Sequence, residues 1–233
     1  MRISAREISV CYNKKGRCIT ALDGVSFTPV AGELTLITGR SGSGKTTLIN
    51  TLAGLLAPAE GLVCYDDTDI YRINDKQLSA FRCKNIGYIP QGASALADLT
   101  VMQNILLPSA LAGTDRADYA EQLIKTLGLE GLCRSYPDEL SGGELRRLAA
   151  ARALINSPSV IFADEPTNDL DSENARVMLE LLKTQAENGA AVIAVTHDST
   201  ALAYADSLYS IDGGRLIGKE NGYEATLCRP LVS

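Results

Sequence analysis

The sequence predicts an α/β fold with a mostly parallel sheet, joined to an antiparallel β portion and a helical portion. Two apolar runs, residues 33–38 and 160–165, are each followed or ended by residues suited to anion or metal chemistry. Open parallel sheets hold their ligands at the carboxyl ends of such strands. Between the two runs the apolar spacing becomes helical over residues 93–136. The ligand site should therefore lie at one edge of the parallel sheet.

The amino-terminal third alternates short strand-like runs with glycine turns up to residue 38. This pattern favours an antiparallel β portion beside the main sheet. Its densest basic group, Lys14, Lys15 and Arg17, belongs to the segment NKKGR, which we interpret as a solvated hairpin turn.

A glycine-rich segment, GRSGSGKT, joins the strand-like run ELTLIT to the helical run TTLINTLAGLL. Its glycines let the backbone turn tightly, so that successive N–H groups point at an anion at the start of the helix. Lys45 is expected to reach terminal phosphates, and the Thr46 hydroxyl to coordinate magnesium. An accidental glycine turn would lack this strand and helix. The expected ligand-binding residues here are Gly39, Arg40, Ser41, Gly42, Ser43, Gly44, Lys45, Thr46 and Thr47.

The run VIFADE predicts a central strand that ends in two carboxylates, Asp164 and Glu165. Asp164 is expected to hold the magnesium shell, through water. Glu165 is expected to orient or deprotonate an attacking water. The alternative is a strand that simply ends in two solvated acids.

The segment LSGGE, residues 140–144, places backbone N–H groups of Ser141, Gly142 and Gly143 at the start of a predicted helix, residues 143–155. Such a helix start is a second anion site. One nucleotide cannot use both anion sites of one chain if they lie on opposite sides of the fold. A second copy, or a close relative, would then have to complete the site.

With these motifs in this order, the sequence resembles the ABC ATPases, the nucleotide-binding subunits of ABC transporters, along essentially its whole length. The resemblance implies a phosphate-loop NTPase core, a single ABC ATPase domain over residues 1–233, and a helical subdomain inserted at about residues 93–136. It also implies ATP and Mg²⁺ as cofactors and ATP hydrolysis coupled to transport as the activity.

The resemblance extends to individual residues. GRSGSGKT resembles the Walker A loop, and VIFADE resembles the Walker B strand with Glu165 as the catalytic glutamate. Gln91 occupies the Q-loop position, where the family's glutamine contacts magnesium. His197 is at the H-switch position that contacts the γ-phosphate, although a lone histidine is ordinarily structural. Tyr12 is placed like the aromatic residue that stacks on adenine, with a core or surface role as the alternative.

LSGGE is similar to the signature motif LSGGQ, which contacts the γ-phosphate of ATP bound to the opposite subunit, and residues 168–171 match the D-loop. The family pattern implies a head-to-tail dimer around two ATP molecules, with an identical or a related cassette as partner. This chain departs from the pattern at Glu144, where the family has glutamine. Ser141 and Glu144 form an S-x-x-E capping box, so we interpret Glu144 mainly as a helix cap.

Two further helices are predicted from apolar spacing. In the middle segment, VMQNILLPSALAG is expected to be interrupted by Pro108, and residues 115–127 form an amphipathic helix that Gly128 ends. In the family, this region receives a coupling helix from the membrane subunit. Residues 172–189 predict another amphipathic helix, capped by Ser172 and stopped by Asn188 and Gly189.

Composition restricts the partners. The chain has 233 residues, 45% of them hydrophobic, but no apolar run of about 18 residues and no signal sequence at its start. We therefore expect no direct membrane insertion, and the resemblance implies attachment to the cytoplasmic face of the cell membrane through a permease. A net charge of −6 argues against a nucleic acid partner. The six cysteines lack a C-x-x-C pair and read as packing residues in a reducing compartment.

Local strings narrow the resemblance within the family. LSAFRCKNIGYIPQ and ADEPTNDLD are similar to strings of the lipoprotein-release and macrolide-exporter branch, although Pro90 and Asn168 depart from its usual forms. This similarity implies export or extrusion of a lipid-linked, peptide or drug-like substrate. The alternative is a mechanical or signalling ATPase of the cell-division type, which moves a membrane partner without transport. Soluble translation or repair members commonly carry two cassettes or long insertions, which are absent from the sequence.

Overall fold

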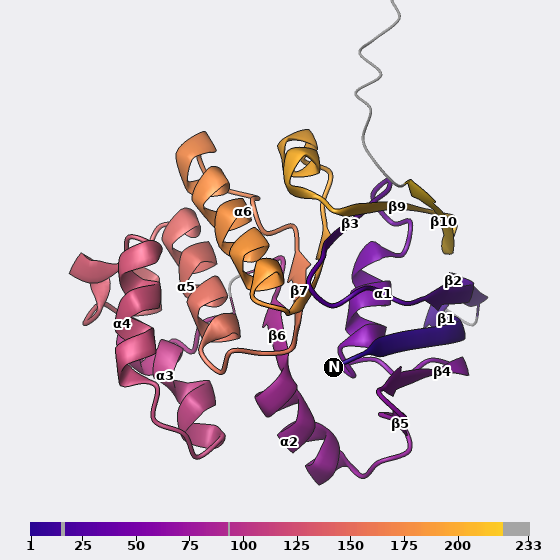
Figure 1. The fold of residues 1–233 in the computed structure, drawn as a ribbon, viewed down its shortest axis with the longest axis horizontal. Coiled ribbons are helices and arrows are strands. Elements are labelled where there is room, and N and C mark those ends of the chain that lie inside the picture. The colour runs from indigo at the N-terminus through magenta and orange to yellow at the C-terminus, as the bar shows by residue number, and fades with distance from the viewer. Residues whose placement is uncertain (15–16, 93, 221–233) are drawn as a thin grey trace, which may run out of the picture.

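The computed structural model of the chain describes residues 1–14, 17–92 and 94–220 (Figure 1). The elements of this part are β1 (Ile3–Lys14), β2 (Arg17–Phe27), β3 (Leu34–Thr38), α1 (Lys45–Leu52), β4 (Glu60–Tyr65), β5 (Thr68–Asp69), α2 (Asp75–Asn85), β6 (Ile86–Ile89), α3 (Val101–Leu111), α4 (Ala117–Thr126), α5 (Gly142–Leu154), β7 (Val160–Asp164), α6 (Ser172–Glu187), β8 (Ala191–Val195), β9 (Ser207–Asp212) and β10 (Arg215–Glu220), with short 3₁₀ turns η1 (Glu130–Leu132), η2 (Pro137–Glu139) and η3 (Ser199–Tyr204).

The main sheet has the strand order β10-β9-β3-β8-β7-β6. All neighbouring strands from β9 to β6 are parallel, and only the edge strand β10 is antiparallel to β9. The carboxyl ends of these parallel strands therefore meet at one edge of the sheet. The predicted α/β class with a mostly parallel sheet is confirmed.

The main sheet is covered on both faces, and its strands alternate between two cores. In β7, Ile161 and Ala163 contribute to a core shared with α3, α4, α5 and α6. Val160 and Phe162 point to the opposite face, into a core shared with α1 and the second sheet. Because successive side chains of a strand point to opposite faces, a short and wholly apolar strand is able to serve both cores.

The second sheet is antiparallel, with the strand order β2-β1-β4-β5, as predicted for the amino-terminal portion. Its first two strands are longer than expected, at 12 and 11 residues. Lys14 pairs with Arg17, and residues 15 and 16 of the predicted hairpin turn lie outside the described residues. Helix α1 contacts β7 and β8 of the main sheet and β2 of this sheet, so it joins the two sheets.

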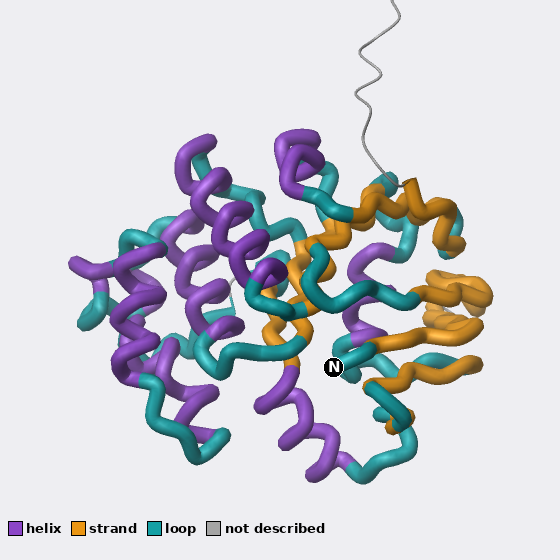
Figure 2. Tube along the Cα trace, viewed as in Figure 1, coloured by secondary structure: helices purple, strands orange, loops and turns teal. Residues whose placement is uncertain are grey.

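Helices α3, α4 and α5 lie at the end of the molecule opposite the antiparallel sheet (Figure 2). In α4, the predicted apolar face is present, since Ala120, Leu123 and Ile124 are buried. Gly128 follows in a left-handed conformation with φ 62°, as expected for a residue that ends a helix. This face packs into the same core as α5 and the main sheet.

The predicted interruption at Pro108 is wrong, because α3 continues through this residue to Leu111. A proline inside a helix costs about 3 kcal/mol relative to alanine. Here tertiary packing outweighs that cost, since Val101 and Ile105 of α3 are fully buried in the helical core. The Pro108 carbonyl also accepts a hydrogen bond from the Asn156 side chain at 3.1 Å.

Two helix boundaries differ from the prediction, and one helix was not predicted. The cap of α6 is Asp171 and not Ser172, because the Asp171 side chain accepts the Asn174 N–H at 2.8 Å. Helix α1 ends at Leu52, well before the predicted residue 56, since Gly54 adopts φ 71°. Helix α2 was not predicted. None of its residues is buried, so its sequence lacks the apolar periodicity from which the other helices were predicted.

We expect Phe162→Ala to destabilise the fold strongly. Among the described residues, Phe162 is the largest fully buried side chain, and it lies midway along β7, the strand beside the edge strand β6. Its truncation should lower the free energy of unfolding by about 3–5 kcal/mol, measured by urea denaturation. The matched control is Leu111→Ala, at a side chain that is 74% exposed, which should change the free energy by less than about 0.5 kcal/mol. Similar effects of the two variants would contradict the packing described here.

Candidate functional site

The phosphate loop, residues 39–46, leaves β3 at its carboxyl end and turns directly into α1. Gly42 and Gly44 have φ angles of 76° and 110°, which favour glycine. A Cβ at Gly39 would lie 2.4 Å from the Ile211 carbonyl, and one at Gly44 would lie 2.4 Å from the Ala21 carbonyl. The backbone of this loop is therefore fixed by close contacts as well as by its conformation.

Two polar groups of the loop fit an anionic ligand. Lys45 Nζ donates hydrogen bonds to the carbonyls of Gly39 at 2.8 Å and Arg40 at 3.1 Å, so the ammonium group lies across the loop. The Ser43 hydroxyl is buried and has no hydrogen-bond partner in the described part of the chain. Buried polar atoms without partners are uncommon, and a bound phosphate would satisfy this one.

Asp164 ends β7 beside the phosphate loop and is 2% exposed. Burial raises the pKa of the Asp164 carboxyl, and the nearby Glu165 charge raises it further. A hydrogen bond with the Thr46 side chain and the charge of Lys45 act in the opposite direction. A buried carboxylate beside a hydroxyl and an ammonium group is well placed to accept a bound cation, which would favour its ionised form.

Glu165 follows immediately and is held in a strained conformation with φ 49°. Its N–H donates to the Val195 carbonyl at 2.9 Å, which ties it to the end of β8. Its Oε2 lies 2.9 Å from His197 Nδ1 and accepts the His197 backbone N–H at 3.3 Å. The Glu165 carboxylate is thus oriented by a histidine whose own side chain is 73% exposed.

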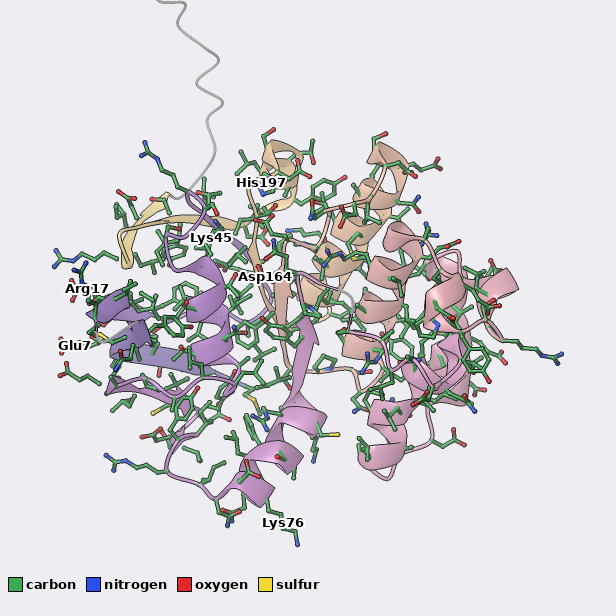
Figure 3. All side chains as sticks on the ribbon, turned by 180° about the vertical axis from the view of Figure 1, so that it is seen from behind. Glu7, Arg17, Lys45, Lys76, Asp164 and His197 are labelled. Carbon is green, nitrogen blue, oxygen red and sulfur yellow. The ribbon has the colours of Figure 1, made fainter. Side chains whose placement is uncertain are left out.

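Lys45, Asp164, Glu165 and His197 line one cavity of about 710 Å³, whereas the buried Ser43 is not among its lining residues. Figure 3 shows Lys45, Asp164 and His197 near one another on the ends of neighbouring elements, with Arg17 and Lys76 at the periphery. The lining residues are Tyr12, Ile19, Thr20, Ala21, Gly39, Arg40, Ser41, Gly42, Gly44, Lys45, Thr46, Thr47, Gln91, Asp164, Glu165 and His197.

Tyr12 of β1 lies at the rim of this cavity, 44% exposed, with its hydroxyl 3.3 Å from the Thr47 hydroxyl. Three lining residues of β2, Ile19, Thr20 and Ala21, were missed by sequence reasoning. The hairpin register places Ile19 opposite Tyr12. Only the pairing of these two strands could therefore have indicated that Ile19 lies near the site.

Oxygen atoms suited to a hard cation meet in the cavity. Thr46, Gln91 and Asp164 all line it, and Asp164 is hydrogen-bonded to Thr46. Within the described ranges, no group of three or more histidine, cysteine or acidic residues could hold a metal by itself. A cation of the magnesium type binds through one or two carboxylates, water and ligand phosphates, so the set present here fits that requirement.

The signature residues do not line this cavity. Ser141 caps α5, and its hydroxyl accepts the Glu144 N–H at 3.3 Å. Glu144 Oε2 accepts the Ser141 hydroxyl and the Ser141 N–H, each at 2.7 Å. These bonds lower the pKa of the Glu144 carboxyl, the hydroxyl bond most. The predicted capping box is confirmed, and Glu144 is occupied by its own helix.

Arg146 was not predicted as a site residue, yet it connects several of its parts. It is 5% exposed on α5, and its guanidinium donates to the carbonyls of Pro90 and Gln91. The same group lies 3.8 Å from the Asp169 carboxylate in the D-loop. Within the run GELRRLAAARALI nothing distinguishes this arginine from its neighbour Arg147, so the sequence carried no signal for its burial.

Membrane-spanning helices and cysteine pairing were the two structural questions raised by composition. In the described ranges, none of the helices has the length and hydropathy needed to cross a membrane. Cys11, Cys18, Cys64, Cys83 and Cys133 are free thiols, and Cys228 lies outside the described residues.

Comparison with known proteins shows which family shares this sequence and fold. A family model described as "ABC transporter" matches residues 22–168. The ABC transporter ATP-binding protein YtrE of Bacillus subtilis is 38% identical over 216 residues, which cover 90% of this chain and 94% of YtrE. The lipoprotein-releasing system ATP-binding protein LolD of Idiomarina loihiensis is 36% identical, with 94% of this chain and 98% of LolD covered.

The macrolide export ATP-binding/permease protein MacB of a Shewanella strain is 38% identical over 97% of this chain, which spans only 36% of MacB. The predicted resemblance to the lipoprotein-release and macrolide-exporter branch is thus confirmed. Among solved structures, a dimeric post-hydrolysis state of the ATP-binding cassette MJ0796 bound to ADP and Pi has a TM-score of 0.89 and 31% identity. The match covers 95% of this chain and all of that one.

We expect Glu144→Gln to change neither the stability of the protein nor its ATP turnover much. Glutamine keeps an oxygen that can accept the Ser141 N–H, so the free energy of unfolding should change by less than about 0.5 kcal/mol and ATP turnover by less than about tenfold. The control Glu144→Ala removes both bonds and should destabilise the protein by about 1 kcal/mol. A gain in turnover well above tenfold for Glu144→Gln would show that the carboxylate does more than cap α5.

Proposed function

Because the chain belongs to the ABC transporter family and is an ATPase of the ABC type, we propose that it dimerises around two Mg-ATP molecules and drives a membrane permease. The observation that carries the proposal is that Lys45, Thr46, Asp164 and His197 line one cavity with the phosphate loop. Residues that the sequence assigned to phosphate, metal and water thus come from α1, from β7 and from the segment after β8, and they meet at one place.

In the proposed complex, the phosphate loop holds the phosphates with its backbone N–H groups and the Ser43 hydroxyl, and Lys45 turns from its own carbonyls to the terminal phosphates. Thr46, Gln91 and Asp164 supply oxygen atoms to Mg²⁺, which when bound neutralises phosphate charge. Tyr12, with Ile19 beside it, forms the apolar surface for adenine.

Glu165 is the proposed general base for the attacking water. Its carboxylate is held by His197 Nδ1 and by the His197 N–H, which favours one orientation. A base must be positioned before its pKa matters, so this support from β8 is the relevant feature. His197, largely exposed, remains able to contact a γ-phosphate in the assembled site.

The signature segment of a second copy is proposed to complete each site. Residues 141–144 lie outside the cavity, so one chain offers the two anion-binding elements on separate surfaces. A two-fold dimer would pair each cavity with the signature of its partner. The dimeric state of the similar cassette MJ0796 supports this arrangement.

The membrane partner is proposed to bind the helical segment, residues 93–136, at the cytoplasmic face of the cell membrane. This segment would form a subdomain inserted into the single ATPase domain, 1–233. Similarity to LolD and MacB supports export of a lipid-linked, peptide or drug-like substrate. Purification of the native membrane complex tests this point: a permease whose substrate stimulates ATP hydrolysis is expected, and a partner that responds to no transported compound would favour a signalling role.

Replacement of the proposed base gives a direct test. Glu165→Gln keeps the shape of the side chain and its contact with the His197 N–H, so ATP binding should persist and the ATP-bound dimer should become long-lived. Turnover should fall by at least about 100-fold, measured by phosphate release. Glu60→Gln, at an exposed acid on β4, is the control and should retain full turnover. Normal hydrolysis by Glu165→Gln would assign the base elsewhere.

Blocking the signature gives an independent test of pairing. Ser141→Arg places a long side chain where a partner's γ-phosphate is expected and should abolish ATP-dependent dimerisation, measured by light scattering, while each chain still binds ATP. Ser141→Ala, which loses the cap but leaves the surface open, should still dimerise. An ATP-dependent dimer in Ser141→Arg as strong as in the unmodified chain would remove the signature from the composite site.

A further inference from the structure

The two surfaces that the proposed dimer brings together carry opposite charges at one place. We propose that Arg40 of each protomer forms an ion pair with Asp169 of a second, identical copy, beside the terminal phosphate of the shared ATP. This inference rests on the proposed function and adds the identity of the partner, because a chain that supplies both members of the pair completes its own site.

Arg40 is positioned at the phosphate end of the cavity. It is the second residue of the phosphate loop, it is exposed, and it lines the cavity. Its carbonyl accepts a hydrogen bond from Lys45 Nζ at 3.1 Å, so its backbone lies beside the group proposed to reach the terminal phosphates. In the described part of the chain, no hydrogen bond or ion pair is formed by its guanidinium.

Asp169 is positioned at the signature. Its side chain is 64% exposed and its backbone adopts φ 64°, a conformation uncommon outside glycine. A Cβ on Gly142 would lie 3.9 Å from Asp169 Cβ, and one on Gly143 would lie 3.4 Å from the Asp169 carbonyl. The Asp169 carboxylate therefore borders the glycines that are proposed to receive the γ-phosphate of the partner's ATP.

The two positions meet in the dimer because both border the same terminal phosphate. Arg40 approaches it from the chain that binds the nucleotide, and Asp169 approaches it from the chain that supplies the signature. A carboxylate next to a polyanion is repelled unless a cation accompanies it. The exposed guanidinium of Arg40, with its long side chain, is the cation that the facing surface provides.

Competing partners for Asp169 and Arg40 are already engaged. Arg146 of the same chain lies 3.8 Å from Asp169, near the limit for an ion pair, and its guanidinium donates to the Pro90 and Gln91 carbonyls. Glu144, the other acid at the signature, accepts two hydrogen bonds from Ser141. Asp169 has only two long contacts in the described ranges, to Arg146 at 3.8 Å and to the Asn168 amide at 3.5 Å. With its side chain 64% exposed, it remains available to a second copy.

Charge reversal in separate chains tests the pair. In a Glu165→Gln background that prolongs the ATP-bound state, Arg40→Asp and Asp169→Arg are each expected to weaken ATP-dependent dimerisation at least tenfold, measured by sedimentation at saturating ATP. Mixing the two variants restores opposite charges at both sites of the mixed dimer. The mixture should therefore associate within about threefold of the parent, with both variants present in equal amounts.

The controls separate the inference from the proposed function. Lys76→Asp reverses an exposed charge on α2, far from Lys45 in Figure 3, and should dimerise like the parent. ATP binding by each single variant, measured with a fluorescent nucleotide, confirms that saturation was reached. If the parent fails to pair with ATP, the proposed function is wrong. If the parent pairs but the mixture is no tighter than the single variants, only the ion pair is wrong.

Discussion

The parallel ladder of the main sheet is the constraint on which the rest of the structure depends. Its hydrogen bonds pair Ile37 with Val195 and Asp164 with Val195, so the ends of β3, β7 and β8 are level with one another. The residues that follow these ends then meet without needing long side chains. A phosphate loop, two carboxylates and a histidine, drawn from distant parts of the sequence, become neighbours because the strands that precede them share one register.

The same architecture separates the two anion-binding elements. The phosphate loop leaves the sheet at the cavity, whereas the signature opens α5, which packs in the helical core on the other face. Neither element reaches the other within one chain, and each keeps its local geometry fixed by glycine contacts or by a capping box. Because both elements are already fixed, little conformational entropy would be lost when a ligand brings the phosphate loop of one chain to the signature of another.

The sequence predicted the parts of the site that depend on residue type at a strand end, such as Lys45, Asp164 and Glu165, because their chemistry and their position are both local. It did not predict Ile19 or Arg146, whose roles arise from strand pairing and from burial between distant segments. Local rules failed in the same way for the fold: Pro108 was expected to interrupt α3, but packing against α5 decides the outcome. The assigned roles of the site residues, unlike the family and the fold, stay predictions.

The position of Arg146 has a consequence for motion. Its planar guanidinium joins the backbone at Pro90 and Gln91 to the first turns of α5 through two hydrogen bonds. Any shift of the segment that carries Gln91 must therefore displace α5 with it, or break two charge-assisted hydrogen bonds of a guanidinium that is 5% exposed. The Arg146 guanidinium therefore couples two surfaces: a movement of Gln91 at the cavity is transmitted to the signature at the start of α5.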